Sequence, residues 1–196
     1  MRNNHRGRRS RDDRADPLLQ VEWCRVIDQP EAGEAITVVT EPAMHVIRLR
    51  PKPDAGFQPA GERLYMGIDH SKRDVIQDVL GFARIRDLSN AANVELPVVI
   101  QSMIEDAPDV FINQFFNRAG NLSLKMHAFE LLQGVGNKKA MEMVQKRGRA
   151  GWENFSQLDE DCGINAAELL ARRFVAEIQD RSIQPRLLDL LLRQEE

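Results

Sequence analysis

The segment Leu131-Leu132-Gln133-Gly134-Val135-Gly136-Asn137-Lys138-Lys139-Ala140-Met141 places two glycines between two apolar stretches. The apolar spacing predicts a helix on each side, over Leu122–Gln133 and from Asn137 to about Arg147. Glycine adopts backbone angles that other residues reach only at a cost, so residues 134–136 are predicted to form a tight turn. Val135 is expected to point inward and to fix the turn to the core.

The start of the second predicted helix is suited to an anion, because the first backbone N–H groups of a helix lack partners and carry the positive end of its dipole. Lys138 and Lys139 lie in that first turn. Cations there act against the dipole, so they make sense if an anion such as a nucleic-acid phosphate binds at the same place. The pattern resembles the helix-hairpin-helix motif of proteins that bind nucleic acid without sequence specificity. The alternative is an ordinary helical hairpin with a glycine turn.

The candidate contact residues are the turn, the first helical turn after it and nearby cations. They are Gly134, Val135, Gly136, Asn137, Lys138, Lys139, Lys125, Arg147 and Arg149, with Lys146 extending the patch.

The composition requires any such contact to be local. The chain has 196 residues, 29% of them charged, and a formal net charge of −3, which argues against a globally basic nucleic-acid binder. Its two cysteines, Cys24 and Cys162, form no CxxC pair and are expected to be buried thiols of a reducing compartment. Neither a run of about 18 apolar residues nor a secretory signal is visible, which favours a cytoplasmic protein without membrane association.

The remaining chain divides by composition. Residues 1–17 carry six arginines among polar residues and are predicted to be a disordered arm, which either grips RNA phosphates or acts as a solubilising tail. Residues 18–86 contain short alternating segments at 19–26, 35–39, 44–49, 62–68 and 81–85, with a helical piece over Ser71–Leu80. Five short strands predict a small OB-like barrel, although strand number alone does not separate it from an SH3-like barrel.

Residues 87–182 are predicted to be all-helical, which makes the fold class α+β. One helix is expected to end before Pro97, a second to cover Pro97–Glu105, and a third to follow a cap at Asp109. A second, degenerate hairpin around Gly163 is interpreted as structural. Residues 183–196 are a tail whose apolar helix either packs back onto the domain or meets a partner.

Aromatic and polar residues of the barrel offer weaker signals. Trp23 and Tyr65 either stack on bases or belong to the core. His45 and His70 have no second ligand at metal spacing, and Asp69-His70-Ser71 is read as a helix cap. Because no nucleophile–base pair, metal cluster or P-loop is visible, an enzyme is the weakest class, and no cofactor is expected.

The order of these features resembles archaeal domain-of-unknown-function family 655 (DUF655), whose members are labelled nucleotide- or RNA-binding. The resemblance covers about residues 23–178, and its most specific parts are the Phe115–Ala119 segment and the glycine hairpin. It implies an OB-like barrel, a helix-hairpin-helix domain and no established catalysis. It also implies RNA as the partner, with the ribosome or rRNA as a candidate. Gln133 stands where the family commonly has Pro, and Asn137 where it has Lys or Gly.

Three functions remain open at this point. The first is a non-catalytic RNA-binding protein of translation or ribosome assembly, contacting the backbone through the hairpin. The second is a DNA-binding repair or recombination accessory protein, and the third is a protein-interaction adaptor. The oligomeric state is undetermined.

Overall fold

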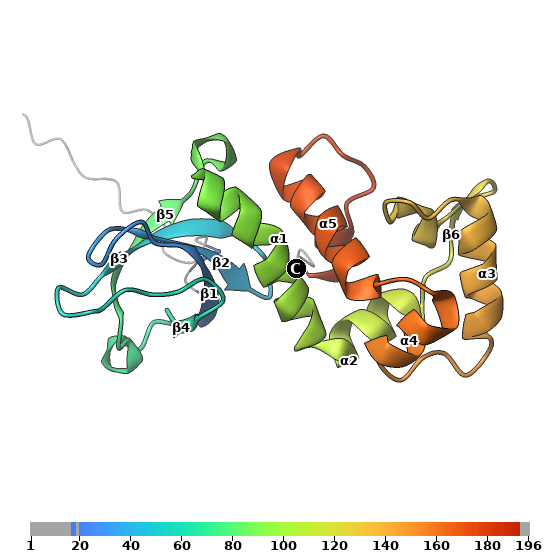
Figure 1. Cartoon of the computed structure of the whole chain (residues 1–196), viewed down its shortest axis with the longest axis horizontal. Helices are drawn as coiled ribbons and strands as arrows, with labels where there is room; N and C mark the ends of the chain where they lie inside the picture. Colours follow the sequence, from blue (N-terminus) through green and yellow to red (C-terminus); the bar gives the residue numbers. More distant parts are fainter. Residues whose placement is uncertain (1–16, 19, 193–196) are drawn as a thin grey trace, which may run out of the picture.

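Five antiparallel strands form a curled sheet in the first half of the computed structural model, which describes residues 17–18 and 20–192 (Figure 1). They are β1 (Trp23–Asp28), β2 (Ile36–Glu41), β3 (Val46–Pro51), β4 (Arg63–Tyr65) and β5 (Ile76–Phe82). The order across the sheet is β4-β1-β2-β3-β5, so β4 and β5 form its edges. The predicted barrel-like sheet is therefore confirmed.

Alternation along the strands sorts the side chains between two faces. Cys24 and Val26 of β1 point into the sheet's concave core together with Ile36 and Val38 of β2. Trp23 and Arg25 lie on the outer face and are only partly buried. Both cysteines are free and buried, as predicted.

The predicted helix over Ser71–Leu80 is wrong. A short 3₁₀ turn (His70–Lys72) is followed by β5, and the predicted strand at 81–85 begins five residues earlier, at Ile76. The β-branched residues Val75, Ile76 and Val79 fit a pleated surface, and β3 offers an edge for pairing.

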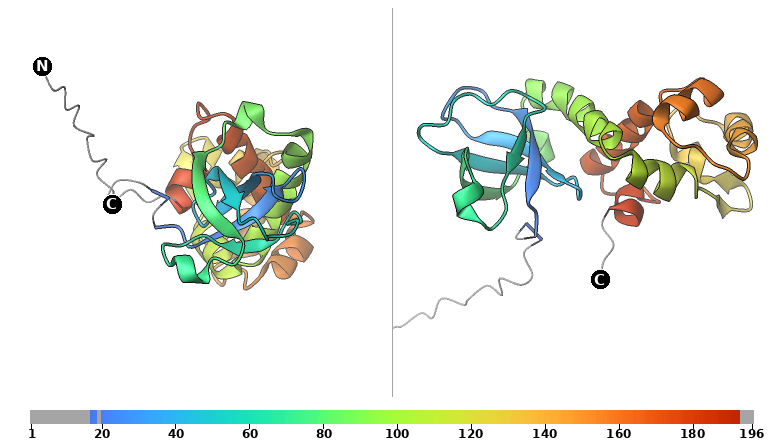
Figure 2. Two further views of the ribbon diagram at one scale, coloured as in Figure 1. Left: turned by 90° about the vertical axis from the view of Figure 1, so that its left-hand side faces the viewer. Right: turned by 90° about the horizontal axis from the view of Figure 1, so that it is seen from below.

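Helix α1 (Asn90–Glu105) joins the two halves (Figure 2). Ser89 caps it, and Pro97 lies inside it, so the predicted break at Pro97 is wrong. Leu96 and Ile100 flank the proline and are fully buried. Their packing offsets the hydrogen bond that Pro97 cannot donate, which normally costs about 3 kcal/mol.

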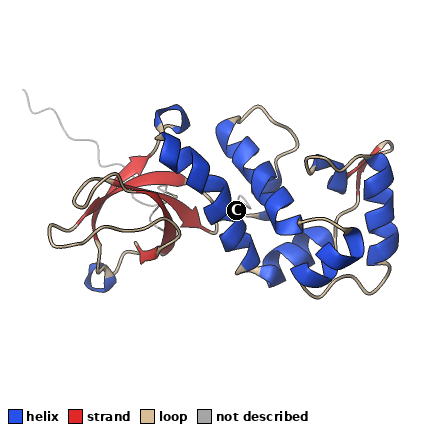
Figure 3. Ribbon diagram, in the orientation of Figure 1, coloured by secondary structure: helices blue, strands red, loops and turns tan. Residues whose placement is uncertain are grey.

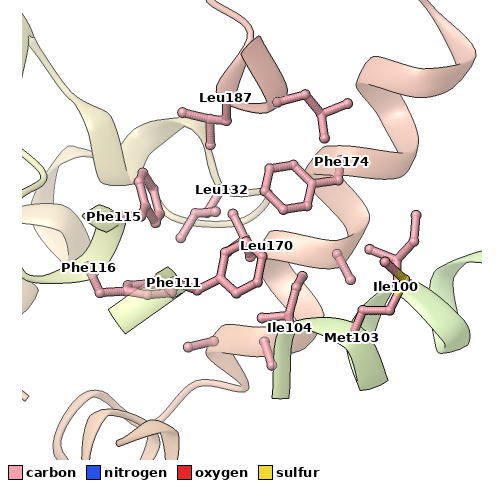
Figure 4. Packing of buried hydrophobic residues seen from close by; sticks show 14 of the residues in the cluster. Ile100, Met103, Ile104, Phe111, Phe115, Phe116, Leu132, Leu170, Phe174 and Leu187 are labelled. Atoms are coloured by element: carbon pink, nitrogen blue, oxygen red, sulfur yellow. The ribbon is translucent and has the colours of Figure 1, made fainter. Parts of the chain in front are cut away.

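The second half is mainly helical (Figure 3). Its elements are α2 (Pro108–Phe111), a π-helical segment (Ile112–Phe116), β6 (Asn121–Ser123), β7 (Met126–His127), a 3₁₀ turn (Ala128–Leu131), α3 (Asn137–Arg147), α4 (Phe155–Cys162), α5 (Ala166–Gln179) and α6 (Leu187–Leu191). Phenylalanines from α2, the π-helical segment and α5 meet in its core, as Figure 4 shows. The expected cap at Asp109 is also wrong, because α2 begins at Pro108 after Ala107.

The predicted helix Leu122–Gln133 is wrong as well. Leu122, Leu124 and Met126 recur every second residue and belong to the exposed β6–β7 hairpin rather than to a helical face. A 3₁₀ turn follows, closed by a capping box between His127 and Glu130. The chain therefore enters the glycine turn from one 3₁₀ turn, not from a long helix.

The C-terminal helix α6 packs back onto the domain, the first of the two alternatives given above. The carboxylate of Glu177 is fully buried and accepts hydrogen bonds from the backbone N–H groups of Leu187 and Leu188, at 2.9 and 3.0 Å. Arg173 pairs with the same carboxylate at 2.7 Å. Leu187 and Leu188 are buried in the core, whereas Leu190 stays exposed.

Within the described residues, no helix combines the length and apolar character needed to cross a bilayer. The predicted arm lies outside those residues except for Pro17.

Candidate functional site

The glycine turn has the predicted local form. Gly134 has φ +83°, in the region that favours glycine. Val135 is buried, and its N–H donates to the carbonyl of Leu132 at 3.0 Å. The turn is therefore anchored to the core by its middle residue.

Helix α3 begins without a side-chain cap. Gly136 is the N-cap residue and has no side chain to accept a hydrogen bond from the N–H groups of the first turn. Asn137 and Lys138 are exposed in that turn. Within the described residues, the ammonium group of Lys138 makes no ion pair or hydrogen bond.

Lys139 has a different task. Its ammonium group donates to the carbonyl of Cys162 at the end of α4 and pairs with Glu142 at 3.2 Å. This side chain bridges α3 and α4. Of the two lysines in the first turn of α3, Lys138 alone points to solvent without a partner.

The two glycine turns face one groove. A hollow of about 520 Å³ is lined by Gly134 and Val135 on one side and by Gly163, Ile164 and Asn165 on the other. The turn between α4 and α5 has the predicted helix–turn–helix form, with Gly163 in the left-handed region at φ +61°. Both turns thus lie together, although about 27 residues separate them in sequence.

The second turn satisfies its own backbone. The side chain of Asn165 accepts from the N–H of Glu168 at 3.0 Å, and the carboxylate of Asp159 accepts from the N–H of Ala166 at 2.7 Å. Burial raises the pKa of Asp159, and the hydrogen bond from Ala166 opposes that rise. Glu168 adds an acidic group to the first turn of α5. Of the two helices that follow these turns, α3 is the one whose start has no side-chain cap.

The other candidate cations are separated from this turn. Arg147 ends α3, and the helix of 11 residues spans about 16 Å. Its guanidinium donates to the carbonyls of Phe116 and Ala119 at 3.0 and 2.7 Å, and it lies over the Phe129 ring. Lys146 donates to the carbonyl of Asp161. Arg149 and Lys125 are exposed, the latter at the β6–β7 tip.

Sequence reasoning missed two groups that the structure brings together. His127 and Glu130 fix the 3₁₀ turn that leads into the glycines. Phe82 lies exposed on the sheet with Arg48 and Arg84 beside it. The signal for the second group was present, since Phe82 and Arg84 alternate with Gly81 and Ala83 as outward residues of a strand would.

The described residues hold no cluster of three or more His, Cys, Asp or Glu side chains that could bind a metal ion. The fold and site together define an α+β protein in which a half-barrel sheet is joined by a shared helix to a helical half with two adjacent turns.

The comparisons with known proteins place the chain within a family. The family model described as a protein of unknown function, DUF655, matches residues 29–187. The chain therefore belongs to this family, which confirms the family that the sequence resembles.

The chain is similar to two archaeal proteins. The uncharacterized protein MJ0038 of Methanocaldococcus jannaschii is 28% identical over 135 residues, which is 69% of this chain and 60% of the relative. The crystal structure of Af1531 from Archaeoglobus fulgidus, also a DUF655 protein, superposes with a TM-score of 0.76 at 25% identity and covers 85% of this chain and 98% of that one.

Proposed function

We propose that the protein is a non-catalytic nucleic-acid-binding protein that grips the phosphate backbone at the start of α3, with RNA favoured over DNA. The observation that carries the proposal is the uncapped N-terminus of α3, which opens beside a groove shared by both turns. Three features meet there: free N–H donors, the positive end of the helix dipole and the unpaired ammonium group of Lys138.

The finer fold assignments belong to the same proposal. A five-stranded, partly open antiparallel barrel in the order β4-β1-β2-β3-β5 supports an OB-like unit. The pair α4–α5 around Gly163 and the glycine turn before α3 support two related hairpins, the first of which has replaced its leading helix with a 3₁₀ turn. In this reading the first hairpin binds and the second supports it.

Binding of this kind is nearly blind to sequence and sensitive to salt, because it depends on phosphates. One clamp on a chain with net charge −3 gives modest affinity by itself. The proposal therefore needs a second contact on the same strand.

The test replaces Lys138 with glutamate in the full chain and titrates a fluorescent structured RNA at several salt concentrations. We expect weaker binding and a slope of log K against log salt that is smaller by about 1, because one phosphate contact is lost. Lys72→Glu is the matched control. It changes the net charge equally but lies in the 3₁₀ turn between β4 and β5, in the other half of the molecule (Figure 1).

Equal affinities and slopes for wild type and Lys138→Glu would remove the hairpin from the proposal. Competition between the structured RNA and duplex DNA of equal length then separates the RNA-binding function from a role in DNA repair or recombination. A preference for duplex DNA would favour the latter.

A further inference from the structure

An aromatic ring stands exposed on the sheet, away from the hairpin groove. Phe82, at the end of β5, is 53% exposed. His45 holds it edge to face, with ring centroids 5.4 Å apart. Phe82 also lines two hollows, one of about 360 Å³ and one of about 70 Å³. The ring is therefore a ridge with a hollow on each side.

Arginines surround this ridge. Arg48 from β3 and Arg84 line the larger hollow, and Arg181, which follows α5, lines the smaller one. Within the described part of the chain, none of the three guanidinium groups forms an ion pair or hydrogen bond. Three cations from three separate segments thus face one exposed aromatic.

The acidic groups near the ridge are already engaged. Asp28 accepts a hydrogen bond from the hydroxyl of Ser89 at 2.6 Å, and Asp87 lies 3.7 Å from the guanidinium of Arg86. Glu177 is buried with Arg173. The accessible surplus at this place is positive, although the whole chain is acidic.

The other aromatic surface of the sheet, around Trp23, differs both in the exposure of its ring and in the charge around it. Trp23 is covered by the guanidinium of Arg63, 4.2 Å from the ring centroid, and Tyr65 meets it edge-on. The neighbouring groove of about 810 Å³ is lined by Glu22, Glu41 and Asp106. Glu41 and Asp106 hold the two arginines of this groove, Arg25 and Arg63, in ion pairs of 2.6–2.8 Å. The Trp23 surface therefore offers a polyanion no unpaired cation from its own lining, and Glu22 adds a negative charge.

We propose that Phe82 with Arg48, Arg84 and Arg181 binds an unpaired stretch of the nucleic-acid strand. One base stacks on the Phe82 ring, and the arginines hold the flanking phosphates. Aromatic stacking between arginines is how proteins hold single strands without reading their sequence. The inference rests on the proposed function and supplies the second contact that it requires, with a preference for unpaired over paired strands.

The test measures the full chain against two fluorescent probes of equal length, an unstructured oligouridine and a duplex RNA. Phe82→Ala is expected to weaken oligouridine binding about fivefold or more, which corresponds to about 1 kcal/mol, and to leave duplex binding unchanged. Phe57→Ala is the matched control, since Phe57 is 57% exposed in the loop between β3 and β4. It should bind both probes as wild type does.

Phe82→Trp guards against a folding defect, because it keeps an aromatic face. It should bind oligouridine at least as tightly as wild type, and binding should quench its fluorescence by more than that of wild type, which has only Trp23 and Trp152. Wild-type affinity of Phe82→Ala for oligouridine overturns the inference, and so does quenching of Phe82→Trp at saturation that is no greater than that of wild type. If Lys138→Glu weakens binding in the same series, the proposed function still stands. A wild-type protein that binds neither probe at low salt overturns both.

Discussion

At the scale of single residues, Gly136 is a position where a substitution can change stability and ligand affinity in different directions. Its φ of −86° is accessible to any residue, and a Cβ built there meets no atom within 4 Å. Neither backbone geometry nor space therefore requires a glycine at this position. By contrast, Gly134 has a positive φ and is required by the turn.

Gly136→Asp should stabilise the protein and weaken its binding to RNA. The carboxylate would cap the first turn of α3, adding from a few tenths to about 1 kcal/mol to the free energy of unfolding. It would also occupy the N–H groups proposed for the phosphate and repel it. Thermal unfolding and RNA titration of the same preparation measure the two effects.

The two effects have opposite signs, so a general folding defect cannot imitate them. Gly136→Ala leaves the donors free and should bind nearly as wild type does. An Asp variant that is more stable and equally tight in binding would show that the start of α3 is not the contact.

At the scale of elements, His127 controls the 3₁₀ turn that enters the hairpin. Its Nδ1 accepts the N–H of Phe129 at 3.1 Å, which requires that nitrogen to be unprotonated. Burial lowers the pKa of His127 below its ordinary value, and the charge of Arg147 lowers it further. The folded state therefore binds this proton less readily than the unfolded state does.

The free energy of unfolding should consequently fall as the pH drops below about 6.5, the ordinary pKa of histidine. The loss continues until the pH passes the lowered pKa of the folded state. His127→Asn keeps a capping oxygen but does not titrate, so it should lose less stability than wild type. Urea unfolding at pH 7.5 and 5.5 measures the difference, and parallel losses in both proteins would exclude His127 as the titrating group.

Elements with local causes could be predicted from the sequence. The glycine turn, the buried Val135 and the helix–turn–helix around Gly163 follow from residues within a few positions of each other. The prediction of a helix over residues 122–133 was wrong because the apolar residues there fit both a strand period of two and a helical period. Here β pairing and the His127 cap decided the outcome.

The candidate site shows the same boundary between local and distant causes. Lys139 and Arg147 are residue types that commonly bind phosphate, yet they donate to the carbonyls of Cys162 and Ala119. These acceptors lie 23 and 28 residues away, so local sequence carries no sign of them. Lys138 differs from Lys139 only by its side of the helix, which the turn geometry sets.

At the scale of the molecule, the sheet and the helical half share a core. Ile27, Val39 and Val46 on the outer face of the sheet belong to the same buried cluster as Ile100 of α1 and Phe174 of α5. Neither half can expose this cluster without exposing part of the other. Unfolding should therefore be a single cooperative transition.

The two tryptophans test this, because Trp23 lies in the sheet and Trp152 in the helical half. In Trp152→Phe the fluorescence reports the sheet, and in Trp23→Phe it reports the helical half. Within each variant, the urea midpoints from fluorescence and far-UV circular dichroism should coincide. Separate midpoints would indicate halves that unfold independently.

The carboxylate of Glu177 determines which truncations and substitutions at the C-terminal end can test for a partner. It holds α6 by two backbone donors, and α6 in turn closes the core with Leu187 and Leu188. A deletion from Pro185 onward would leave the buried carboxylate of Glu177 without those two donors and open a cavity beside α5. Such a truncation would disrupt the core, so a loss of partner binding would not show that the tail itself makes the contact. Leu190 remains exposed on α6. A substitution there can probe a partner while Leu187 and Leu188 stay packed in the core.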